Sequence, residues 1–298
     1  FQRGFVSQFS GTVTQFERTA PALFAREPVD ELRLLSGSSL FERARLWESP
    51  LLQQVQALDV SRQDLRNEGV EQIANCRTLL NLRRLNINSN YITVPGYECL
   101  SQSPVLRQLT ELDCSYNDAF AEGATCLANS PHLGNLRCLN LSCNEIGPEG
   151  LSALGRATFA EKLQQLELDG NPGYEPLLRD AGMQTLSNLK TFRQLRTLKL
   201  RENQLGNAGL AALVRTALPA LASLDLSGNT ISEEGCFALA RSSLFTQLET
   251  LSLGVNHIEQ GVIHLPLLVR CSRRAAVDQL EPVPVRRVPA VCEGRQAR

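Results

Sequence analysis

LRCLNLSCN, at residues 136–144, is the stretch that decides the fold of this chain. Its leucines Leu136, Leu139 and Leu141 are spaced as in a short strand, and the polar Asn144 follows three positions after the last. Eight such stretches occur, and the polar markers that end them are Gln63, Asn90, Asn117, Asn144, Asn171, Asn203, Asn229 and Asn256. Successive markers lie 27, 27, 27, 27, 32, 26 and 27 residues apart. This period predicts a stack of repeated units, so we expect function to lie on its surface.

Each repeated unit divides into a strand and a helix. The apolar stretch alternates with period two, which is typical of a strand. Six residues after most markers a glycine opens a helical pattern, such as GLSAL at residues 150–154. Prolines such as Pro104 and Pro131 then end the helix before the next strand. The sequence therefore predicts an α/β fold, a right-handed solenoid shaped like a horseshoe, with a parallel sheet on the concave face and helices on the convex face.

The polar markers have a structural role in this interpretation. Where each strand turns towards its helix, backbone N–H and C=O groups are buried without partners in the sheet. A side-chain amide offers both donors and an acceptor, and stacked copies of it form a ladder. We therefore expect Asn90 and its equivalents to brace the turns and not to act in catalysis, and the loss of one costs about 1–3 kcal/mol.

The pattern resembles the leucine-rich repeat family. The 27-residue step, with a Gly-x-x-x-Leu motif on the helix, is similar to the ribonuclease-inhibitor-like subclass of that family. The opening segments, at residues 3–6, 23–24 and 28–34, further resemble the leader of bacterial repeat-companion-domain leucine-rich repeat proteins. The resemblance implies a capping strand and helix at residues 1–28, repeats at residues 29–262, and a degenerate C-terminal end at residues 263–298. The unit at residues 29–54 is itself degenerate, with Gly37 in the marker position.

Composition limits the class of protein. No apolar stretch in the 298 residues approaches the roughly 18 residues of a membrane helix. Nine cysteines occur without the spacing of metal ligands, and Cys99 and Cys126 stand where other units have alanine. We therefore expect reduced thiols and a cytoplasmic protein, in a bacterium as the resemblance implies. Because the chain begins at Phe1 and not at a methionine, we expect it to be a fragment of a longer product.

The sequence offers little for catalysis. Its three histidines are His132, His257 and His264, and no Ser or Cys nucleophile is placed to pair with them. No Gly-rich phosphate loop, His-Glu-x-x-His or Gly-x-Ser-x-Gly motif occurs. We therefore expect no enzyme activity, no catalytic residue, no cofactor and no metal site.

The concave face follows from the strand alternation, because alternate strand residues point away from the core. Acidic residues dominate it in the first six units, whereas Lys199 and Arg201 form a basic spot in the seventh. One interpretation is a groove for a basic or polar partner; the other is that the repeat consensus supplies these residues for structural reasons. The candidate partner-binding residues are Asp59, Asn86, Glu111, Asp113, Tyr116, Asn140, Glu167, Asp169, Tyr174, Lys199, Arg201 and Asp225.

Two irregularities distinguish the chain from a regular array. Five extra residues lie within residues 171–182, between strand and helix, and place Tyr174 in a loop that is either a recognition site or a neutral insertion. After Gly261 the pattern is lost, and from Arg270 onward seven arginines oppose three acids. A basic tail of this kind is typical of disorder. Three roles for this tail stay open: docking on the acidic face, contact with nucleic acid, or none.

We expect a non-catalytic protein–protein interaction scaffold that binds its partner on the concave face or through the inserted loop. The partner is expected to be basic or polar, because acidic residues dominate the face. Since Tyr116 is the one aromatic anchor well placed on the groove, a partner held there alone should bind weakly or depend on salt. A membrane or a nucleic acid is not the expected partner, and we expect a monomer. The alternatives are a sensor or regulatory region of a larger multidomain protein, or an arch that regulates a GTPase.

Overall fold

The computed structural model describes residues 7–35, 40–170 and 177–258. Within these residues ten strands form one sheet in the order β1 to β10, and every neighbouring pair is parallel. The strands are β1 Gln8–Gly11, β2 Glu31–Leu34, β3 Ala57–Asp59, β4 Arg84–Asn86, β5 Glu111–Asp113, β6 Cys138–Asn140, β7 Gln165–Glu167, β8 Thr197–Lys199, β9 Ser223–Asp225 and β10 Thr250–Ser252.

A helix follows each strand up to β9. The helices are α1 Val13–Phe24, α2 Leu40–Trp47, α3 Arg66–Ala74, α4 Val94–Gln102, α5 Phe120–Ala128, α6 Gly147–Leu154, α7 Arg179–Asn188, α8 Asn207–Arg215, α9 Glu233–Ala240 and α10 Ser243–Gln247. Short 3₁₀ helices, Pro50–Gln54 and Pro104–Gln108, begin at prolines in two of the returns to the next strand. The repeats thus alternate strand and helix, as the sequence predicts.

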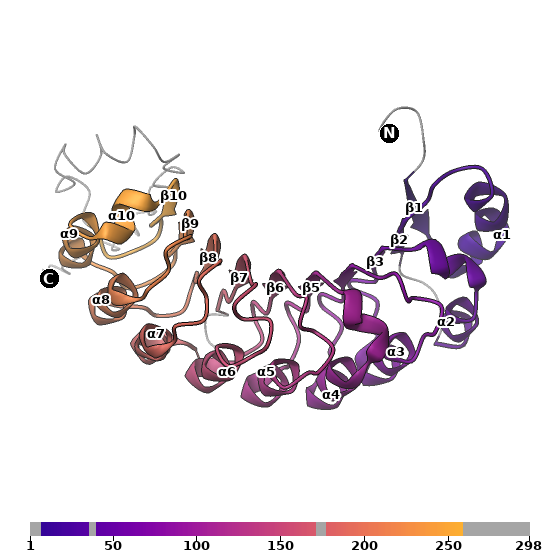
Figure 1. The fold of residues 1–298 in the computed structure, drawn as a ribbon, viewed down its shortest axis with the longest axis horizontal. Coiled ribbons are helices and arrows are strands. Elements are labelled where there is room, and N and C mark those ends of the chain that lie inside the picture. Colours follow the sequence, from indigo (N-terminus) through magenta and orange to yellow (C-terminus); the bar gives the residue numbers. More distant parts are fainter. Residues whose placement is uncertain (1–6, 36–39, 171–176, 259–298) are drawn as a thin grey trace, which may run out of the picture.

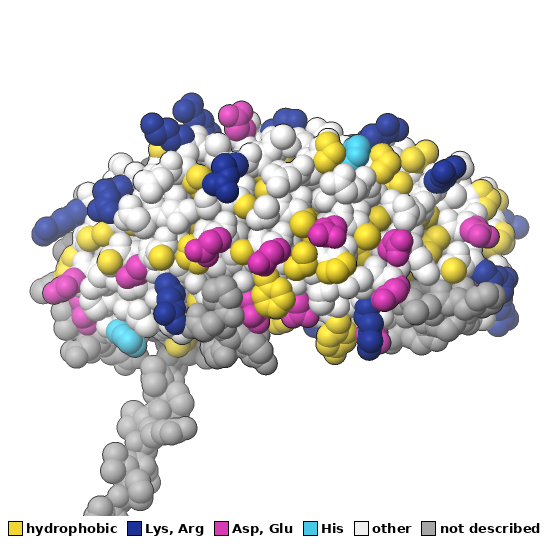
Figure 2. Space-filling view, turned by 90° about the horizontal axis from the view of Figure 1, so that it is seen from below, with side chains coloured by type: hydrophobic (Ala, Val, Ile, Leu, Met, Phe, Trp, Pro, Cys, Tyr) yellow, Lys and Arg dark blue, Asp and Glu magenta, His cyan; other side chains and the backbone are white. Residues whose placement is uncertain are grey.

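The elements stack into an open arch, with the strands on its inner side and the helices on its outer side (Figure 1). Helices are wider than strands, so stacking them on one side bends the array towards the sheet. The outer, helical face carries a row of acidic side chains across its middle (Figure 2). The α/β solenoid with a concave parallel sheet, predicted from the sequence, is confirmed.

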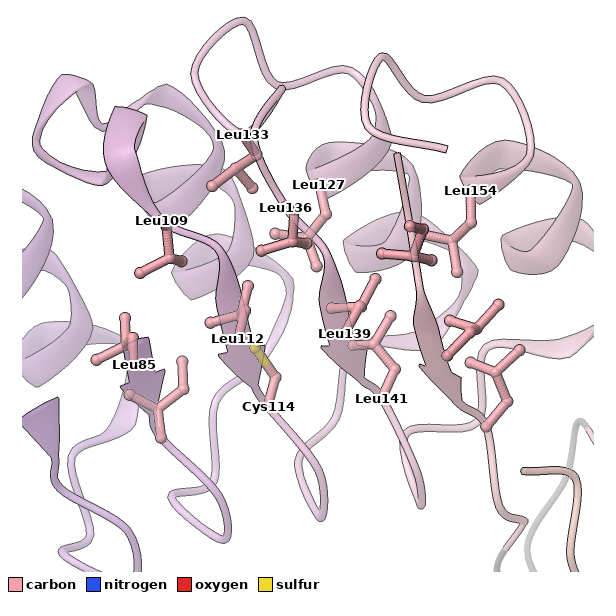
Figure 3. Close-up of a cluster of buried hydrophobic side chains, with 14 of the residues drawn as sticks. Leu85, Leu109, Leu112, Cys114, Leu127, Leu133, Leu136, Leu139, Leu141 and Leu154 are labelled. Carbon is pink, nitrogen blue, oxygen red and sulfur yellow. The ribbon is translucent and has the colours of Figure 1, made fainter. Parts of the chain in front are cut away.

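Leucines in equivalent positions of successive units stack into one continuous core. Leu112, Leu139 and Leu166 are paired in register and no more than 2% exposed. Figure 3 shows Leu112 and Leu139 beside other buried side chains of the central units, including Cys114, which takes a position that is leucine in the next unit. Because each leucine packs against the units on both sides, truncating one to alanine costs about 2–5 kcal/mol.

The marker amides form the expected ladder. Asn90 is fully buried, and its Oδ1 accepts the backbone N–H groups of Gln63 at 2.8 Å and Leu65 at 3.2 Å. Its Nδ2 donates to the carbonyls of Val60 at 2.9 Å and Asn88 at 3.2 Å. Comparable bonds to the preceding unit are made by Asn117, Asn144, Asn203, Asn229 and Asn256. The bracing role predicted for the markers is confirmed, while Asn171 lies outside the described residues.

A second link between units caps helix N-termini from the preceding unit. Asn67 Oδ1 accepts the N–H groups of Thr93 at 3.0 Å and Gly96 at 3.2 Å, at the start of α4. Asp180 Oδ1 accepts the N–H of Gly206 at 2.7 Å, just before α8. These polar side chains accept N–H groups at the helix start, where the helix supplies few acceptors of its own. A Cβ on Gly96, six residues after its marker, would collide with the Ile92 side chain and meet Asn67 Oδ1 at 2.8 Å, so both neighbours favour glycine there.

Residues 1–28, which the sequence analysis assigns to a capping strand and helix, include β1 and α1, and β1 pairs with β2 at one end of the sheet. Since β7 ends at Glu167 and α7 begins at Arg179, the extra residues lie between strand and helix. Tyr174, Gly37 and the tail at residues 263–298 lie outside the described residues. In the described part of the chain, no helix has the length and apolar character of a membrane span.

Candidate partner-binding surface

The concave surface is built from the strand residues that alternate with the buried leucines. Strand register aligns the last residue of each short strand into a column across the sheet. From β2 to β10 this column reads Arg33, which is the third residue of β2, then Asp59, Asn86, Asp113, Asn140, Glu167, Lys199, Asp225 and Ser252. The register therefore places seven of the candidate residues on one face: Asp59, Asn86, Asp113, Asn140, Glu167, Lys199 and Asp225.

Five members of this column also hold the backbone turn that follows their strand. In each, the side-chain Oδ1 accepts the backbone N–H two residues later, which is the geometry of an Asx turn. The five bonds join Asp59 to Ser61 at 3.0 Å, Asn86 to Asn88 at 3.0 Å, Asp113 to Ser115 at 2.9 Å, Asn140 to Ser142 at 3.0 Å, and Asp225 to Ser227 at 2.9 Å. The side chains of Asp and Asn accept this bond equally well. The turn therefore explains why an Asp or an Asn stands at these positions, but not why three of them carry a negative charge. In Asp59 the second carboxylate oxygen meets Arg33, whereas Asp113 and Asp225 use only Oδ1 in this turn.

Ion pairs occupy both ends of the concave face. Arg33 Nε lies 3.4 Å from Asp59 Oδ2, and Arg84 pairs with Glu31. The sequence analysis missed Glu31, Arg33 and Arg84, because it did not extend the columns to β2 or to the first residue of each strand. At the other end Lys199 Nζ lies 2.9 Å from Glu167 Oε1. The basic spot at Lys199 is therefore partly neutralised within the face.

Two carboxylates lie close together at the centre of the face. Glu111 and Asp113 lie on β5, two residues apart, and neither forms an ion pair among the described residues. Arg84 is the register neighbour of Glu111, but its guanidinium pairs with Glu31, two strands away. Glu111 is exposed, and its carboxylate accepts no hydrogen bond from the residues that the structure describes. The centre of the face therefore presents uncompensated negative charge.

A groove runs along the face over these carboxylates. It collects side chains from β1 to β7, and six of the candidate residues line it: Asp59, Asn86, Glu111, Asp113, Asn140 and Glu167. Lys199, Arg201, Asp169 and Asp225 do not line this groove. No arrangement of nucleophile, base and orienting group is apparent along the groove. Its chemistry, acidic at the centre and mixed at the ends, suits recognition of a polar or cationic segment.

Comparisons with known proteins give the type of unit. A protein-family match described as Leucine Rich repeat covers residues 132–155, 193–214 and 219–240. These segments are leucine-rich repeats. An internalin from Listeria monocytogenes is similar at 18% identity and a TM-score of 0.49, covering 86% of this chain and 69% of that one. The yeast Rad7 and Elc1 complex gives 15% identity and a TM-score of 0.32, covering 85% of each chain. Curated protein sequences give no match.

Exposed aromatic side chains follow β4 and β5, where the chain passes from strand to helix. Tyr91, Tyr116 and Phe120 are 69%, 60% and 37% exposed. All three have left-handed backbone conformations, with φ of 55°, 55° and 52°, an unusual conformation for a bulky residue. Gly228 precedes the marker Asn229 as Tyr116 precedes Asn117, so the two residues occupy equivalent positions. The turn therefore does not require an aromatic residue there. We name these three residues the aromatic edge.

Tyr91 and Phe120 were missed by the sequence analysis. The strand alternation used to find the face does not extend past the markers Asn90 and Asn117, whereas both aromatics follow those markers. The sequence signal that identifies them is their position, one and three residues after a marker. That position is known to be exposed only once the turn has been built.

Acidic groups surround Tyr116. Contact with the Cys143 thiol, together with partial burial and the carboxylates of Asp169 and Glu202, raises the pKa of the Tyr116 hydroxyl. Burial also raises the pKa of Asp169, although the N–H of Arg201, bonded to its Oδ1 at 2.9 Å, opposes that shift. Negative charge therefore lies beside the aromatic edge as well as in the groove.

The remaining chemistry-bearing residues are dispersed. The cysteines in the described residues are all free: Cys76, Cys99, Cys114, Cys126, Cys138, Cys143 and Cys236. Several of them fill small apolar positions in the repeated units. Burial raises the pKa of the Cys99 and Cys126 thiols, which disfavours the reactive thiolate. In the described part of the chain, no cluster of His, Cys, Asp and Glu side chains is suited to hold a metal ion.

Proposed function

We propose that this protein is a non-catalytic protein-interaction scaffold, and that its concave groove receives a cationic or polar extended segment of its partner. The observation that carries the proposal is the pair Glu111 and Asp113, which lies at the centre of the groove and has no ionic partner in the described part of the chain. Exposed charges gain little within a fold but give specificity and fast association across an interface.

The dimensions of the groove fit an extended segment. Its lining reaches from β1 to β7, which at the usual strand spacing is about 29 Å. An extended chain covers that length with about nine residues. Because the strands of the arch are all paired along the groove, recognition has to come from side chains and not from addition of a further strand.

The aromatic edge supplies anchors that the groove itself lacks. Tyr116 follows Asp113 by three residues, and its exposed ring lies beside the acidic groups Asp169 and Glu202. An Arg or Lys side chain placed on such a ring gains cation–π attraction of about 0.5–1 kcal/mol at an exposed site. Aromatic residues that keep their exposure in the free protein are frequent energetic centres of interfaces.

The proposal extends to the subclass of the repeats and to the cellular compartment of the protein. A helix in the repeats and a step of 27 residues support the ribonuclease-inhibitor-like subclass. The free cysteines of the described residues support a reducing, cytoplasmic compartment.

The test removes charge from the groove without disturbing the turn. In the double variant Glu111→Gln, Asp113→Asn, the new Asn keeps the bond to the Ser115 N–H, as Asn86 and Asn140 do in their own units. Binding of a labelled Arg–Ser peptide of about nine residues is measured by fluorescence anisotropy. We expect the double variant to bind about tenfold more weakly, with most of the difference lost at high salt.

A matched control removes the same charge elsewhere. Glu161→Gln, Glu249→Gln neutralises two exposed acids in segments that return from helix to strand. It should bind the peptide like the unsubstituted protein. Equal loss in the two variants would mean that net charge alone attracts the peptide, and the groove would then not be the binding site.

A further inference from the structure

Charge is unevenly distributed between the two long edges of the arch. We define the return edge as the segments that lead from helices α3 to α9 back to the next strand, at residues 75–83, 103–110, 129–137, 155–164, 189–196, 216–222 and 241–249. These segments hold ten Lys and Arg residues against two Glu. Figure 2 shows Lys and Arg side chains gathered along one long edge of the molecule. Part of this excess has a local cause, because cations are favoured near the negative C-terminal ends of helices.

One part of the return edge is also hollowed. A groove of about 450 Å³ lies between the C-terminal ends of α7 and α8 and the short helix α10. Lys190, Arg193 and Arg215 line it, all three are exposed, and none forms an ion pair among the described residues. No acidic residue lines the groove. Helix ends alone do not produce a concave site of a single charge sign, so this groove differs from the rest of the edge.

The floor of this groove is aliphatic. Leu189 and Val214 are partly exposed within it, and Leu218 and Leu244 lie buried beneath. Apolar surface left open inside a ring of cations is suited to one apolar side chain flanked by carboxylates. The Arg193 Nε donates to the backbone carbonyl of Lys190 at 3.3 Å, which holds the guanidinium at the groove before any ligand arrives.

We propose that this groove is a second binding site, which takes an acidic peptide segment of a partner protein. Carboxylates of the segment face Lys190, Arg193 and Arg215, and an apolar side chain packs on Leu189 and Val214. A single-stranded nucleic acid fits the same charge less well, because its bases bind by stacking on exposed aromatic rings and no aromatic side chain lines the groove. The site is independent of the concave groove, which prefers the opposite charge.

The experiment measures binding of a labelled peptide of alternating Asp and Glu with a single central Leu. The triple variant Lys190→Gln, Arg193→Gln, Arg215→Gln should bind it about tenfold more weakly than the unsubstituted protein. The matched control is Arg83→Gln, Arg107→Gln, Arg137→Gln, which removes three cations from other units of the return edge. It should bind the peptide within about twofold of the unsubstituted protein. Thermal unfolding of both variants checks that the fold is kept.

Two further ligands separate the specific site from general attraction. The same peptide with Ser in place of Leu should bind more weakly, because the aliphatic floor then gains nothing, and a short single-stranded oligodeoxythymidine should not compete with the Leu peptide. The proposal is overturned if both triple variants lose binding equally, if the Leu and Ser peptides bind alike, or if the oligonucleotide displaces the peptide. None of these results depends on whether the concave groove binds a cationic segment.

Discussion

The Tyr97 hydroxyl donates a hydrogen bond of 2.8 Å to Asn144 Oδ1, although the two residues are 47 positions apart in the chain. Tyr97 lies on α4 and is fully buried, so its ring passes from its own unit towards the one that carries Asn144. On Asn90, Asn117 and Asn229 the same oxygen accepts the backbone N–H of the preceding marker. A side chain therefore replaces a backbone group in one rung of the ladder, and joins three successive units.

Replacing Tyr97 with Phe tests the strength of this link. The ring and its packing remain, but Asn144 loses one buried donor, so we expect a loss of about 1–2 kcal/mol in the free energy of unfolding. Burial already raises the pKa of the Tyr97 hydroxyl well above its ordinary value, so the group acts as a neutral donor. Urea unfolding measures the difference. Tyr116→Phe, at an exposed ring, is the control, and a loss no larger in Tyr97→Phe than in this control would contradict the interpretation.

Removing the Asn90 side chain is expected to lower the free energy of unfolding more than removing the Asn256 side chain. Asn90 is fully buried with bonds at both of its side-chain atoms, whereas Asn256 is partly exposed in the last described unit. Asn90→Ala leaves buried N–H and C=O groups without partners and should cost about 1–3 kcal/mol. Asn256→Ala should cost less, because water can replace its bonds. Urea denaturation of the two variants decides this, and equal losses would show that burial does not set the value of a rung.

Much of the fold could be predicted because it depends on a period. The spacing of Leu139, Leu141 and Asn144, repeated along the chain, requires a stack of units and gives the amides their role. The Tyr97 bond could not be predicted, since Val70 and Leu151 occupy the same position in other units and suggest only an apolar filler. Its partner depends on how far the ring reaches across Ala124, the small residue at that position in the next unit.

The site was predictable only in its residues, not in its charge balance. Strand alternation places Glu111 and Asp113 on the concave face, but it does not show that Arg84 pairs with Glu31 instead of Glu111. The Arg84–Glu31 pair joins side chains on strands that are not adjacent, and it leaves the negative charge at the centre of the groove without an ion pair among the described residues. The groove at Lys190 has no sequence signature either, because it arises where two returns and α10 meet.

Gly209 should not tolerate a side chain. A Cβ there would collide with the Asp180 carboxylate and lie 3.1 Å from the Asp180 Cα, so the cap on the Gly206 N–H would have to move. Gly209→Ala gains helix propensity of up to about 1 kcal/mol but loses about 1–3 kcal/mol to overpacking, so we expect net destabilisation. Gly134→Ala is the matched control, since its nearest contact is the Thr158 Oγ1 at 3.6 Å. Thermal unfolding compares them, and a Gly209→Ala variant as stable as the control would show that the cap does not require glycine.

The half-buried carboxyl of Asp169 predicts how the stability of the fold depends on pH. Burial raises its pKa, so the folded chain binds this proton more tightly than the unfolded chain does. The stability that the protonated carboxyl provides is complete below the ordinary carboxyl pKa and is lost as pH rises through the folded value. Asp169→Asn cannot ionise and keeps an oxygen for the Arg201 N–H, so it should melt above the unsubstituted protein at neutral pH. Thermal unfolding across pH should show this gap closing towards acid, and a gap that widens towards acid would reverse the sign.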